Sequence, residues 1–358
     1  MIILFSGYNQ RAVIAFLRTL RKCKVEDYVI VATTDDDTIF NTIYKDKVEY
    51  VRERELSLEV ISSILDDIDK RYNACSYLIP PTTEFLVRFF QDNREYFEKR
   101  KCILPLVKRE LYNLISDKRT FYDDCKANGI LVPKINNVDV TIPSVAKPKQ
   151  YKSKSGHILS PVIIENLSEW NEFQSNFDKN EFDIQEYIFG ESLYLLFYFG
   201  ERKVYRLVQK NLIQLLNGKS MIAAELDDEN KHKSILDRYQ TYFNNKAFKG
   251  FVMVEVRRND KNYYMIEANP RFWGPSQLFV DSGYNFFEIF LSEYGYLNDS
   301  VEVMVTNRDA KYFWSDGIGG KERKYELCNF HIDNKEEYFA REELFWENDL
   351  LCREDIIR

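Results

Sequence analysis

Acidic and amide side chains suited to holding a metal ion lie in one stretch, positions 250 to 274, which reads GFVMVEVRRNDKNYYMIEANPRFWG. Two apolar runs flank Asp260, Lys261 and Asn262, residues that favour turns, so we predict a β-hairpin with Lys261 at its tip. Antiparallel pairing about this tip places Glu255 opposite Glu267. Directly opposed Cβ atoms lie about 4.5–5.5 Å apart, and like charges at that spacing repel each other. The hairpin therefore needs a compensating charge.

A divalent cation would supply that charge. Mg²⁺ takes oxygen ligands, typically one or two carboxylates together with nucleotide phosphates. Asn269 offers a third oxygen on the same face, and Arg271 a fixed cation for a phosphate or carboxylate. The alternative is a solvent-facing hairpin on which Arg257 and Arg258 neutralise the glutamates. For a metal site, replacing Glu267 by Gln should leave the metal-free protein no less stable but remove Mg²⁺-dependent chemistry.

Alternation with a period of two divides the predicted hairpin into two faces. Met253 shares the face of the two glutamates and Asn269. The predicted core face consists of Val252, Val254, Val256, Tyr264, Ile266 and Ala268.

The order of these features resembles the metal-binding end of the ATP-grasp ligases: an apolar strand with a Glu, a turn, and a second strand that reads IEANPR. The extension RFWG is similar to the branch of carbamoyl-phosphate-synthetase-like enzymes and stand-alone carboxylate–amine ligases. The resemblance implies that Glu255, Glu267 and Asn269 bind Mg²⁺ or Mn²⁺ bridging the phosphates of ATP. It also implies that Arg271 contacts the reacting phosphate as a catalytic residue.

Two lysines and one loop carry further implied contacts to the nucleotide. Lys118 opens a predicted helix in SDKRTFYDDCKANGILVP, and Lys147 lies in the short strand VAKP; the resemblance brings both to the phosphates, and Lys147 also to the adenine. In the following YKSKSGH, Ser153, Ser155 and Gly156 could wrap a phosphate with hydroxyl and backbone N–H groups. This loop has fewer glycines than the family usually has.

The segment DIQEYIFGE, positions 183 to 191, resembles the connection between the two ATP-grasp subdomains, where main-chain groups bind adenine. The implied contacts are the Glu186 carbonyl and the Ile188 N–H, with Glu191 on the ribose. The alternative is an edge strand followed by a turn. The nucleotide-binding residues implied here are Gln185, Glu186, Tyr187, Ile188 and Glu191.

Lys210 is the second implied catalytic residue. Together with Gly218-Lys219-Ser220 it resembles a stretch in which a basic residue and a glycine turn border the reaction centre of the family. Only one of the two glycines usual in that turn is present.

The N-terminal third positions none of these groups but has a clear pattern of its own. Apolar runs at 2–5, 28–32, 48–51 and 76–79 predict strands, and helical periodicity at 12–20 and 56–72 predicts helices between them. Alternating strands and helices indicate a doubly wound α/β unit. The turn after the first strand contains Gly7 but no GxGxxG, which argues against a dinucleotide-dependent dehydrogenase.

The predicted fold class is therefore α/β, with α+β character in the nucleotide-binding part. We expect a doubly wound pre-ATP-grasp domain at 1–115, ATP-grasp subdomains at 116–183 and 184–295, the second of which holds the metal site, and a C-terminal extension at 296–358. The resemblance covers about residues 1 to 295. Residues 301 onward contain no motif that we can interpret.

The amino-acid composition limits the kinds of partner and the cellular compartment that we expect. Lys and Arg number 50 against 57 Asp and Glu, a net charge of −7, which argues against nucleic acid as the main partner. The first residues, MIILFSGYNQR, lack the features of a signal peptide, and no apolar run approaches the roughly 18 residues of a membrane span. Six cysteines without a CxxC pair are typical of a reducing compartment, so we expect a cytoplasmic protein that does not bind membranes.

The predicted function is ATP-dependent ligation of a carboxylate to an amine through an acyl phosphate, releasing ADP and phosphate. Such chemistry needs positioning and charge neutralisation more than a protein nucleophile. The substrates could be an amino acid, a sugar acid or a carrier-bound acyl group, and the sequence is compatible with a homo-oligomer. The alternative is a non-catalytic ATP-binding or regulatory protein that retains the ATP-grasp fold.

Overall fold

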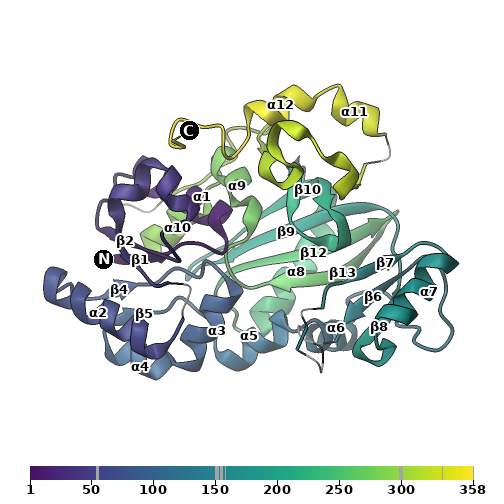
Figure 1. The fold of residues 1–358 in the computed structure, drawn as a ribbon, viewed down its shortest axis with the longest axis horizontal. Helices are drawn as coiled ribbons and strands as arrows, with labels where there is room; N and C mark the ends of the chain where they lie inside the picture. The colour runs from purple at the N-terminus through teal and green to yellow at the C-terminus, as the bar shows by residue number, and fades with distance from the viewer. Residues whose placement is uncertain are drawn as a thin grey trace.

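Three β-sheets form the framework of the protein (Figure 1). The computed structural model describes residues 1–53, 56–149, 153, 156–157, 159–297, 301–332 and 334–357. None of the described helices combines the length and the apolar character needed to cross a membrane.

The first sheet is parallel, with the strand order β3-β2-β1-β4-β5. Its strands are β1 (Ile2–Phe5), β2 (Tyr28–Ala32), β3 (Val48–Val51), β4 (Tyr77–Leu78) and β5 (Cys102–Ile103). The intervening helices are α1 (Gln10–Lys22), η1 (Thr38–Asn41), η2 (Ile43–Lys47), α2 (Leu58–Tyr72), α3 (Glu84–Asp92) and α4 (Arg94–Lys99). Along β1, Ile2 and Leu4 pack with α1, whereas Ile3 and Phe5 pack with α2 and α3. Helices on both faces confirm the predicted doubly wound unit.

The second sheet is antiparallel, with the order β13-β12-β9-β10-β11-β14 and with β15 paired to β10. Its strands are β9 (Glu191–Phe199), β10 (Val204–Leu215), β11 (Met221–Asp227), β12 (Gly250–Asn259), β13 (Asn262–Asn269), β14 (Lys311–Phe313) and β15 (Cys328–Phe330). On β9, Leu193 and Leu195 pack on α8 (Lys233–Asn245), whereas Tyr194 and Leu196 pack toward α1, α9 (Gln277–Asp281) and α10 (Phe286–Glu293). Both faces of this sheet are thus buried against helices.

The third sheet is small, with the order β7-β6-β8. Its strands are β6 (Ser144–Pro148), β7 (Val162–Ile164) and β8 (Phe182–Glu186), and α7 (Leu167–Asn176) packs on it through Phe173. Two helices precede it, α5 (Arg109–Ser116) and α6 (Lys118–Ala127). The Asp117 carboxylate accepts hydrogen bonds from the backbone N–H groups of Arg119 and Thr120, at 3.0 and 2.8 Å, which caps α6 and fixes the direction of its first residue, Lys118.

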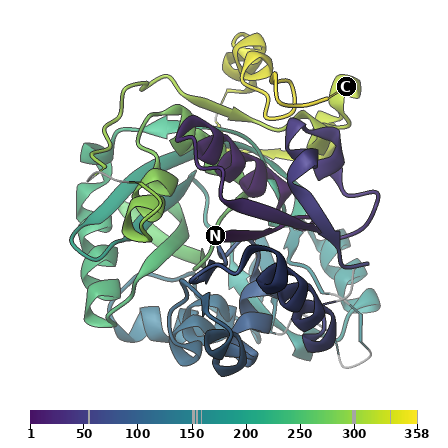
Figure 2. The same cartoon turned by 90° about the vertical axis from the view of Figure 1, so that its left-hand side faces the viewer.

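The first and second sheets are joined through α1, which lies against the strands of the second sheet (Figure 2). Arg11 donates to the Met221 carbonyl at 3.1 Å and to the Ser220 hydroxyl at 2.9 Å. Its guanidinium passes so close to Gly274 that a Cβ there would lie 2.7 Å from Nη2. The glycine of the RFWG sequence thus makes room for this link.

The segment after residue 301 belongs to the same framework. Both β14 and β15 extend the second sheet, which the sequence did not predict, and α11 (Lys335–Phe339) and α12 (Glu342–Glu347) lie beyond β10 (Figure 1). Three short 3-10 helices, η7 (Ser315–Ile318), η8 (Gly320–Glu322) and η9 (Tyr325–Leu327), connect β14 to β15. Arg18 of α1 pairs with Asp355 at 2.7 Å, so the last residues return to the first helix.

Short 3-10 turns adjoin several of these helices and strands. The turn η5 (Glu229–His232) precedes α8, and η4 (Leu216–Gly218) follows β10. The turn η3 (Lys179–Glu181) precedes β8, and η6 (Gly274–Ser276) precedes α9. The division into four units stays a prediction, and β8 crosses its boundary between residues 183 and 184.

Candidate functional site

The hairpin of β12 and β13 has the predicted register where it carries the acidic residues. Glu255 lies opposite Glu267. The next pair toward the turn is Val256 with Met265, so Ile266 has no partner on β12 and forms a β-bulge. Such bulges redirect side chains and change which residues share a face.

Two details of the predicted hairpin are wrong. The turn contains two residues rather than three, and its first residue, Asp260, has a φ of 51°. The bulge exchanges the faces of β13 on the turn side, so Tyr263 and Met265 pack in the core in place of Tyr264 and Ile266. Strict alternation could not predict this exchange because it assumes that no residue is inserted into the ladder.

Glu255 is a buried carboxylate, 5% exposed, that faces a second carboxylate. Among the described residues, none donates a hydrogen bond to it or forms an ion pair with it. Burial and the charge of Glu267 raise the pKa of Glu255 to about 7, and the charges of Arg257 and Lys147 oppose that rise. A buried carboxylate without a partner is unfavourable on its own. Together with a facing carboxylate and an amide oxygen, however, it is a donor set that fits Mg²⁺.

Glu267 has the opposite electrostatic balance. Burial raises its pKa, but Lys118, Lys147, a hydrogen bond from Asn269 and the charge of Arg271 together lower it below the ordinary range. Lys118 Nζ lies 3.7 Å from Oε2, and Asn269 Nδ2 donates to Oε1 at 3.1 Å. The Arg271 guanidinium in turn donates to Asn269 Oδ1 at 3.1 Å. Glu267, Asn269 and Arg271 therefore form one connected chain.

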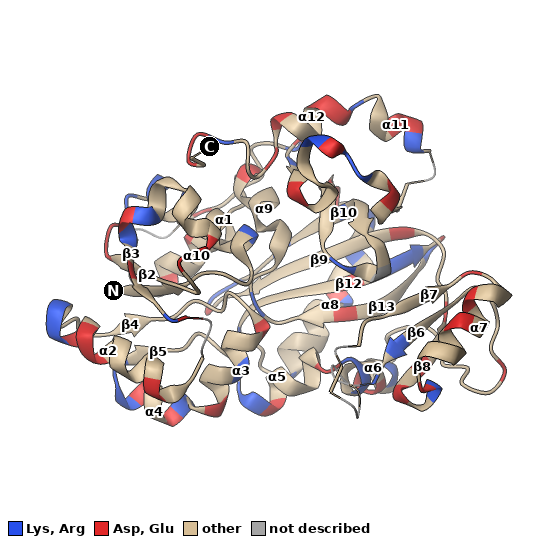
Figure 3. Ribbon diagram, in the orientation of Figure 1, with Lys and Arg blue, Asp and Glu red and all other residues tan. Residues whose placement is uncertain are grey.

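Lys147 on β6 links the small sheet to the hairpin. Its Nζ donates to the carbonyl of Ile266, the bulged residue, at 2.6 Å. Burial and the nearby charge of Lys118 lower the pKa of Lys147 to about 8, while Glu267 and Glu255 oppose this. In Figure 3 the basic residues of β6 and of the start of α6 lie beside the hairpin. The carboxylate pair and these two lysines thus form one compact charged group.

A cavity of about 170 Å³ opens between the hairpin and the small sheet. Its charged lining residues are Lys118, Lys147, Glu186, Lys219, Glu255, Arg257 and Glu267. Apolar side chains form much of the remaining wall, namely Pro133, Val145, Pro161, Ile163, Ile188 and Ile266. An apolar wall next to a charged end suits a ligand with a flat base and an anionic tail.

A second cavity of about 290 Å³ adjoins the first, since Lys118 and Glu267 line both. Asn269 and Arg271 line this one, together with Glu84 and Arg88 of α3 from the N-terminal unit. Lys149, Ser116 and Asp117 are also part of its wall. Together the two cavities reach the range of about 300–1,000 Å³ typical of small-molecule sites.

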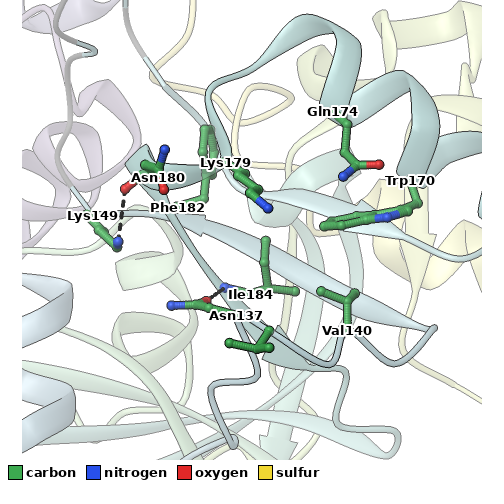
Figure 4. Close-up of a pocket in the computed structure, with 10 residues that line it drawn as sticks. Asn137, Val140, Lys149, Trp170, Gln174, Lys179, Asn180, Phe182 and Ile184 are labelled. Carbon is green, nitrogen blue, oxygen red and sulfur yellow. Dashed lines mark hydrogen bonds between the residues drawn. The ribbon is translucent and has the colours of Figure 1, made fainter.

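A third cavity, of about 370 Å³, lies in the small sheet and shares Lys149 with the second cavity. It is lined by Trp170 and Gln174 of α7 and by Lys179 and Asn180 (Figure 4). Lys149 Nζ donates to the Asn180 carbonyl at 2.9 Å at its edge. None of the predicted site residues that the structure describes lines it.

The predicted adenine-binding segment lies at the first cavity. Gln185, Glu186, Tyr187 and Ile188 all line it. The Glu186 carboxylate accepts a hydrogen bond from the backbone N–H of Lys134 at 2.9 Å, which fixes the end of β8. The main-chain contacts implied for Glu186 and Ile188 stay predictions.

The structure does not bring Lys210 and Glu191 to the cavities. Lys210 lies opposite Leu193, which packs against α8, whereas Glu255 lies opposite Tyr194 on the other face. The Lys210 side chain therefore projects from the far face of the sheet, where its Nζ lies 3.3 Å from Oε1 of Glu191. The sequence resemblance could not predict the face of the sheet from which Lys210 projects, because that face depends on the strand register.

The predicted phosphate loop lies largely outside the described residues, and Ser155 is among those not described. Ser153 and Gly156 form a turn in which the Gly156 N–H donates to the Ser153 carbonyl at 2.9 Å. The Ser153 hydroxyl also accepts from the backbone N–H of His157 at 3.0 Å. Neither residue lines the two cavities.

Five basic side chains near the cavities were not predicted as site residues. Each of Arg88, Lys149, Lys219 and Arg257 lines a cavity, and His331 contacts Arg257. For Arg257 the signal is present, since a residue two positions after Glu255 must share its face. His331 gives no such signal because its approach depends on β15.

No protein-family model matches the chain, and no curated protein matches it either. Solved structures do resemble it. An N5-carboxyaminoimidazole synthetase from Staphylococcus aureus has a TM-score of 0.59 at 12% identity, covering 85% of this chain and 79% of that one. An L-amino acid ligase from Bacillus licheniformis has a TM-score of 0.59 at 13% identity, covering 85% and 74%.

A further similar structure is that of a protein from Archaeoglobus fulgidus described as belonging to the ATP-grasp superfamily. Its TM-score is 0.54 at 15% identity, covering 81% of this chain and 87% of that one. At such identities the likeness is one of fold. The chain has the ATP-grasp fold, with a parallel α/β unit preceding the two sheets that enclose the candidate site.

Proposed function

We propose that the protein is an ATP-dependent ligase that joins a carboxylate to an amine. The observation that carries this proposal is the buried Glu255 carboxylate, which faces Glu267 at a cavity also lined by Lys118 and Lys147. Two facing carboxylates are unfavourable in the empty site and become favourable once a divalent cation and phosphates are bound. Neighbours with this fold include an enzyme described as an L-amino acid ligase and a biotin carboxylase in a complex with β-γ-ATP.

The residues of the first cavity divide between the two ends of a nucleotide. The apolar wall and the segment from Gln185 to Ile188 would receive adenine, and Lys118 and Lys147 would hold phosphate oxygens. Glu255, Glu267 and Asn269 would hold Mg²⁺, which, when bound, would neutralise charge on the transferring phosphoryl group.

The second cavity would receive the acceptor carboxylate. Its oxygen attacks the terminal phosphorus, the bond from that phosphorus to the bridging oxygen breaks, and ADP leaves with the electron pair. The amine then attacks the acyl carbon, phosphate leaves, and the amine loses a proton. Arg271, held by Asn269, would stabilise the phosphate in both steps.

The lining of the second cavity indicates the chemical class of the substrates. Arg88 and Arg271 favour an anionic acceptor, and Glu84 favours an amino group, a combination that an amino acid satisfies.

We also propose that the protein is cytoplasmic, because six cysteines without a CxxC pair are typical of a reducing compartment.

The test is a coupled assay of ADP release with Mg-ATP over pooled amino acids and other carboxylates, with products identified by mass. ADP release that requires both a carboxylate and an amine, and a product of their combined mass less water, supports the ligase. Binding of Mg-ATP without ADP release for any pool favours the alternative, a non-catalytic ATP-binding protein.

A further inference from the structure

Three side chains from separate parts of the chain form one hydrogen-bonded group: Arg257 of β12, which lines the first cavity, Gln214 of β10, and His331, which follows β15. The pairing of β15 with β10 places Asn329 opposite Gln214, and the backbone N–H of His331 donates to the Leu212 carbonyl at 2.9 Å. Arg257 Nη1 lies 2.9 Å from His331 Nδ1. His331 Nε2 lies 3.0 Å from Gln214 Oε1.

The hydrogen bonds fix the tautomer of His331. Gln214 Nε2 donates to the Lys219 carbonyl at 2.9 Å, so its amide oxygen is the atom that faces His331. His331 must then carry its proton on Nε2, which leaves Nδ1 to accept from Arg257. Burial and the charge of Arg257 lower the pKa of His331 well below its ordinary value, so the ring is neutral. The 3.4 Å approach of Arg257 Nη2 to His331 Nε2 joins two N–H groups and is not a hydrogen bond in this tautomer.

The neutral ring of His331 therefore fixes the orientation of the Arg257 guanidinium. Among the described residues, no carboxylate forms an ion pair with it, whereas the adjacent Arg258 pairs with Glu191 at 2.8 Å on the other face. Arg257 lines the cavity beside Glu255 and Lys147. A partly buried guanidinium held by a neutral ring favours an anion in the space that it faces.

The position along β12 indicates which anion. Arg257 is two residues from Glu255, about 6.6–6.8 Å along the strand, on the side of the hairpin turn. The next residue, Arg258, is paired with Glu191, which lies three positions after Ile188, one of the implied adenine contacts. Arg257 thus lies between the proposed metal-binding carboxylates and the proposed adenine end, where the phosphate chain of a nucleotide would pass.

We infer that Arg257 binds a phosphate group of the nucleotide and that His331 and Gln214 are its positioning residues. The segment after residue 301, which carries no recognisable motif, thereby completes the nucleotide site. The inference rests on the proposed function, since it takes the first cavity as the place of ATP.

Calorimetric titration of adenosine, AMP, Mg-ADP and Mg-ATP tests the contact. Arg257→Gln should weaken Mg-ATP and Mg-ADP roughly tenfold and leave adenosine unchanged, because one charge-assisted hydrogen bond is lost. The control is Arg238→Gln, the same charge change on α8, an exposed helix position against the far face. Equal weakening of adenosine, or unchanged affinity for every nucleotide, would overturn the inference. Failure of the unaltered protein to bind Mg-ATP would instead refute the proposed function itself.

A second pair of variants tests the role of His331. His331→Ala should weaken Mg-ATP several-fold, and His331→Asn should retain most of the affinity, since its amide can accept from Arg257 and donate to Gln214. In the double variant with Arg257→Gln, His331→Ala should add no further loss, because both act through one guanidinium. Additive losses would show that His331 does not act by positioning Arg257.

Discussion

The two facing carboxylates of the hairpin differ so much in their surroundings that the same substitution should have opposite effects on stability. Glu255 is buried without a partner, and its pKa is raised to about 7. Glu267 is stabilised by Lys118 and Asn269, and its pKa is lowered. Glu255→Gln should therefore stabilise the metal-free protein near pH 8, whereas Glu267→Gln should destabilise it. From the sequence alone we predicted that Glu267→Gln leaves the stability of the metal-free protein unchanged or raises it. The structure changes this prediction, because Glu255 and not Glu267 is the carboxylate without a partner among the described residues.

The magnitude follows from linkage between proton binding and folding. A group whose pKa rises on folding makes the native state bind more protons than the unfolded state between the two pKa values, so stability falls as the pH rises through that window. From 4.5 to about 7 the penalty for Glu255 grows to about 3 kcal/mol at pH 8. Glutamine removes this penalty and should change little below the unfolded pKa. Loss of the Glu267 carboxylate should cost about 1 kcal/mol through its lysine and amide partners.

Urea unfolding in the presence of a chelator, at several values between pH 5.5 and 8, measures both effects. The difference in free energy of unfolding between Glu255→Gln and the unaltered protein should grow by about 2 kcal/mol over this range. Both variants should lose the stabilisation that Mg-ATP gives, since each lacks a proposed metal ligand. Parallel pH curves for Glu255→Gln and the unaltered protein, or a less stable Glu255→Gln at pH 8, would refute the assignment of the strained charge to Glu255.

Three further predictions follow from the same contacts. Mg-ATP at a hundredfold excess over Kd should stabilise the fold by about 2.7 kcal/mol, and a chelator should remove most of this, as measured by thermal denaturation; a melting temperature indifferent to Mg-ATP would count against the site. The pKa of Lys147 is lowered to about 8, so the free energy of unfolding of the nucleotide-free protein should rise between about pH 8 and 10.5. Lys147→Met should lack this rise when unfolding is measured over a series of pH values, and it should also weaken ATP binding. The same pH dependence in the variant and the unaltered protein would contradict this prediction. Gly274→Ala should displace Arg11 and cost about 1–3 kcal/mol by thermal denaturation, whereas in a protein that already carries Arg11→Ala the same substitution should cost much less; equal costs in the two backgrounds would contradict the packing argument.

Local pattern was enough to locate the elements and the carboxylate pair. The register at Glu255 and Glu267 follows from a short turn between two apolar strands, and the α/β unit follows from four apolar runs with helices between them. Both depend on interactions between residues that are close in sequence or in one repeating pattern. These predictions are confirmed.

The remaining features depend on tertiary contacts that no local pattern encodes. The bulge at Ile266 brings its carbonyl to Lys147, more than a hundred residues earlier in the chain. The face of Lys210 depends on its register with β9, and the approach of His331 depends on β15 adding to the sheet. A sequence resemblance predicts which residue types occupy which positions, but it does not predict the strand register that decides where a side chain points.

The two adjoining cavities would hold the nucleotide and the acceptor of the proposed reaction on opposite sides of a shared set of residues. Lys118 and Glu267 line both, so charged groups lie between the proposed nucleotide site and the proposed acceptor site. The acceptor side is closed by the N-terminal unit, because Asn9 donates to the Phe272 carbonyl at 3.2 Å and the Phe272 N–H donates to the Pro81 carbonyl at 2.9 Å. These bonds tie the segment after Arg271 to the start of α3, which carries Glu84 and Arg88. Substrate choice should therefore respond to substitutions in α3, while nucleotide affinity should not, because Glu84 and Arg88 line the second cavity and no residue of α3 lines the first, which is the proposed nucleotide site.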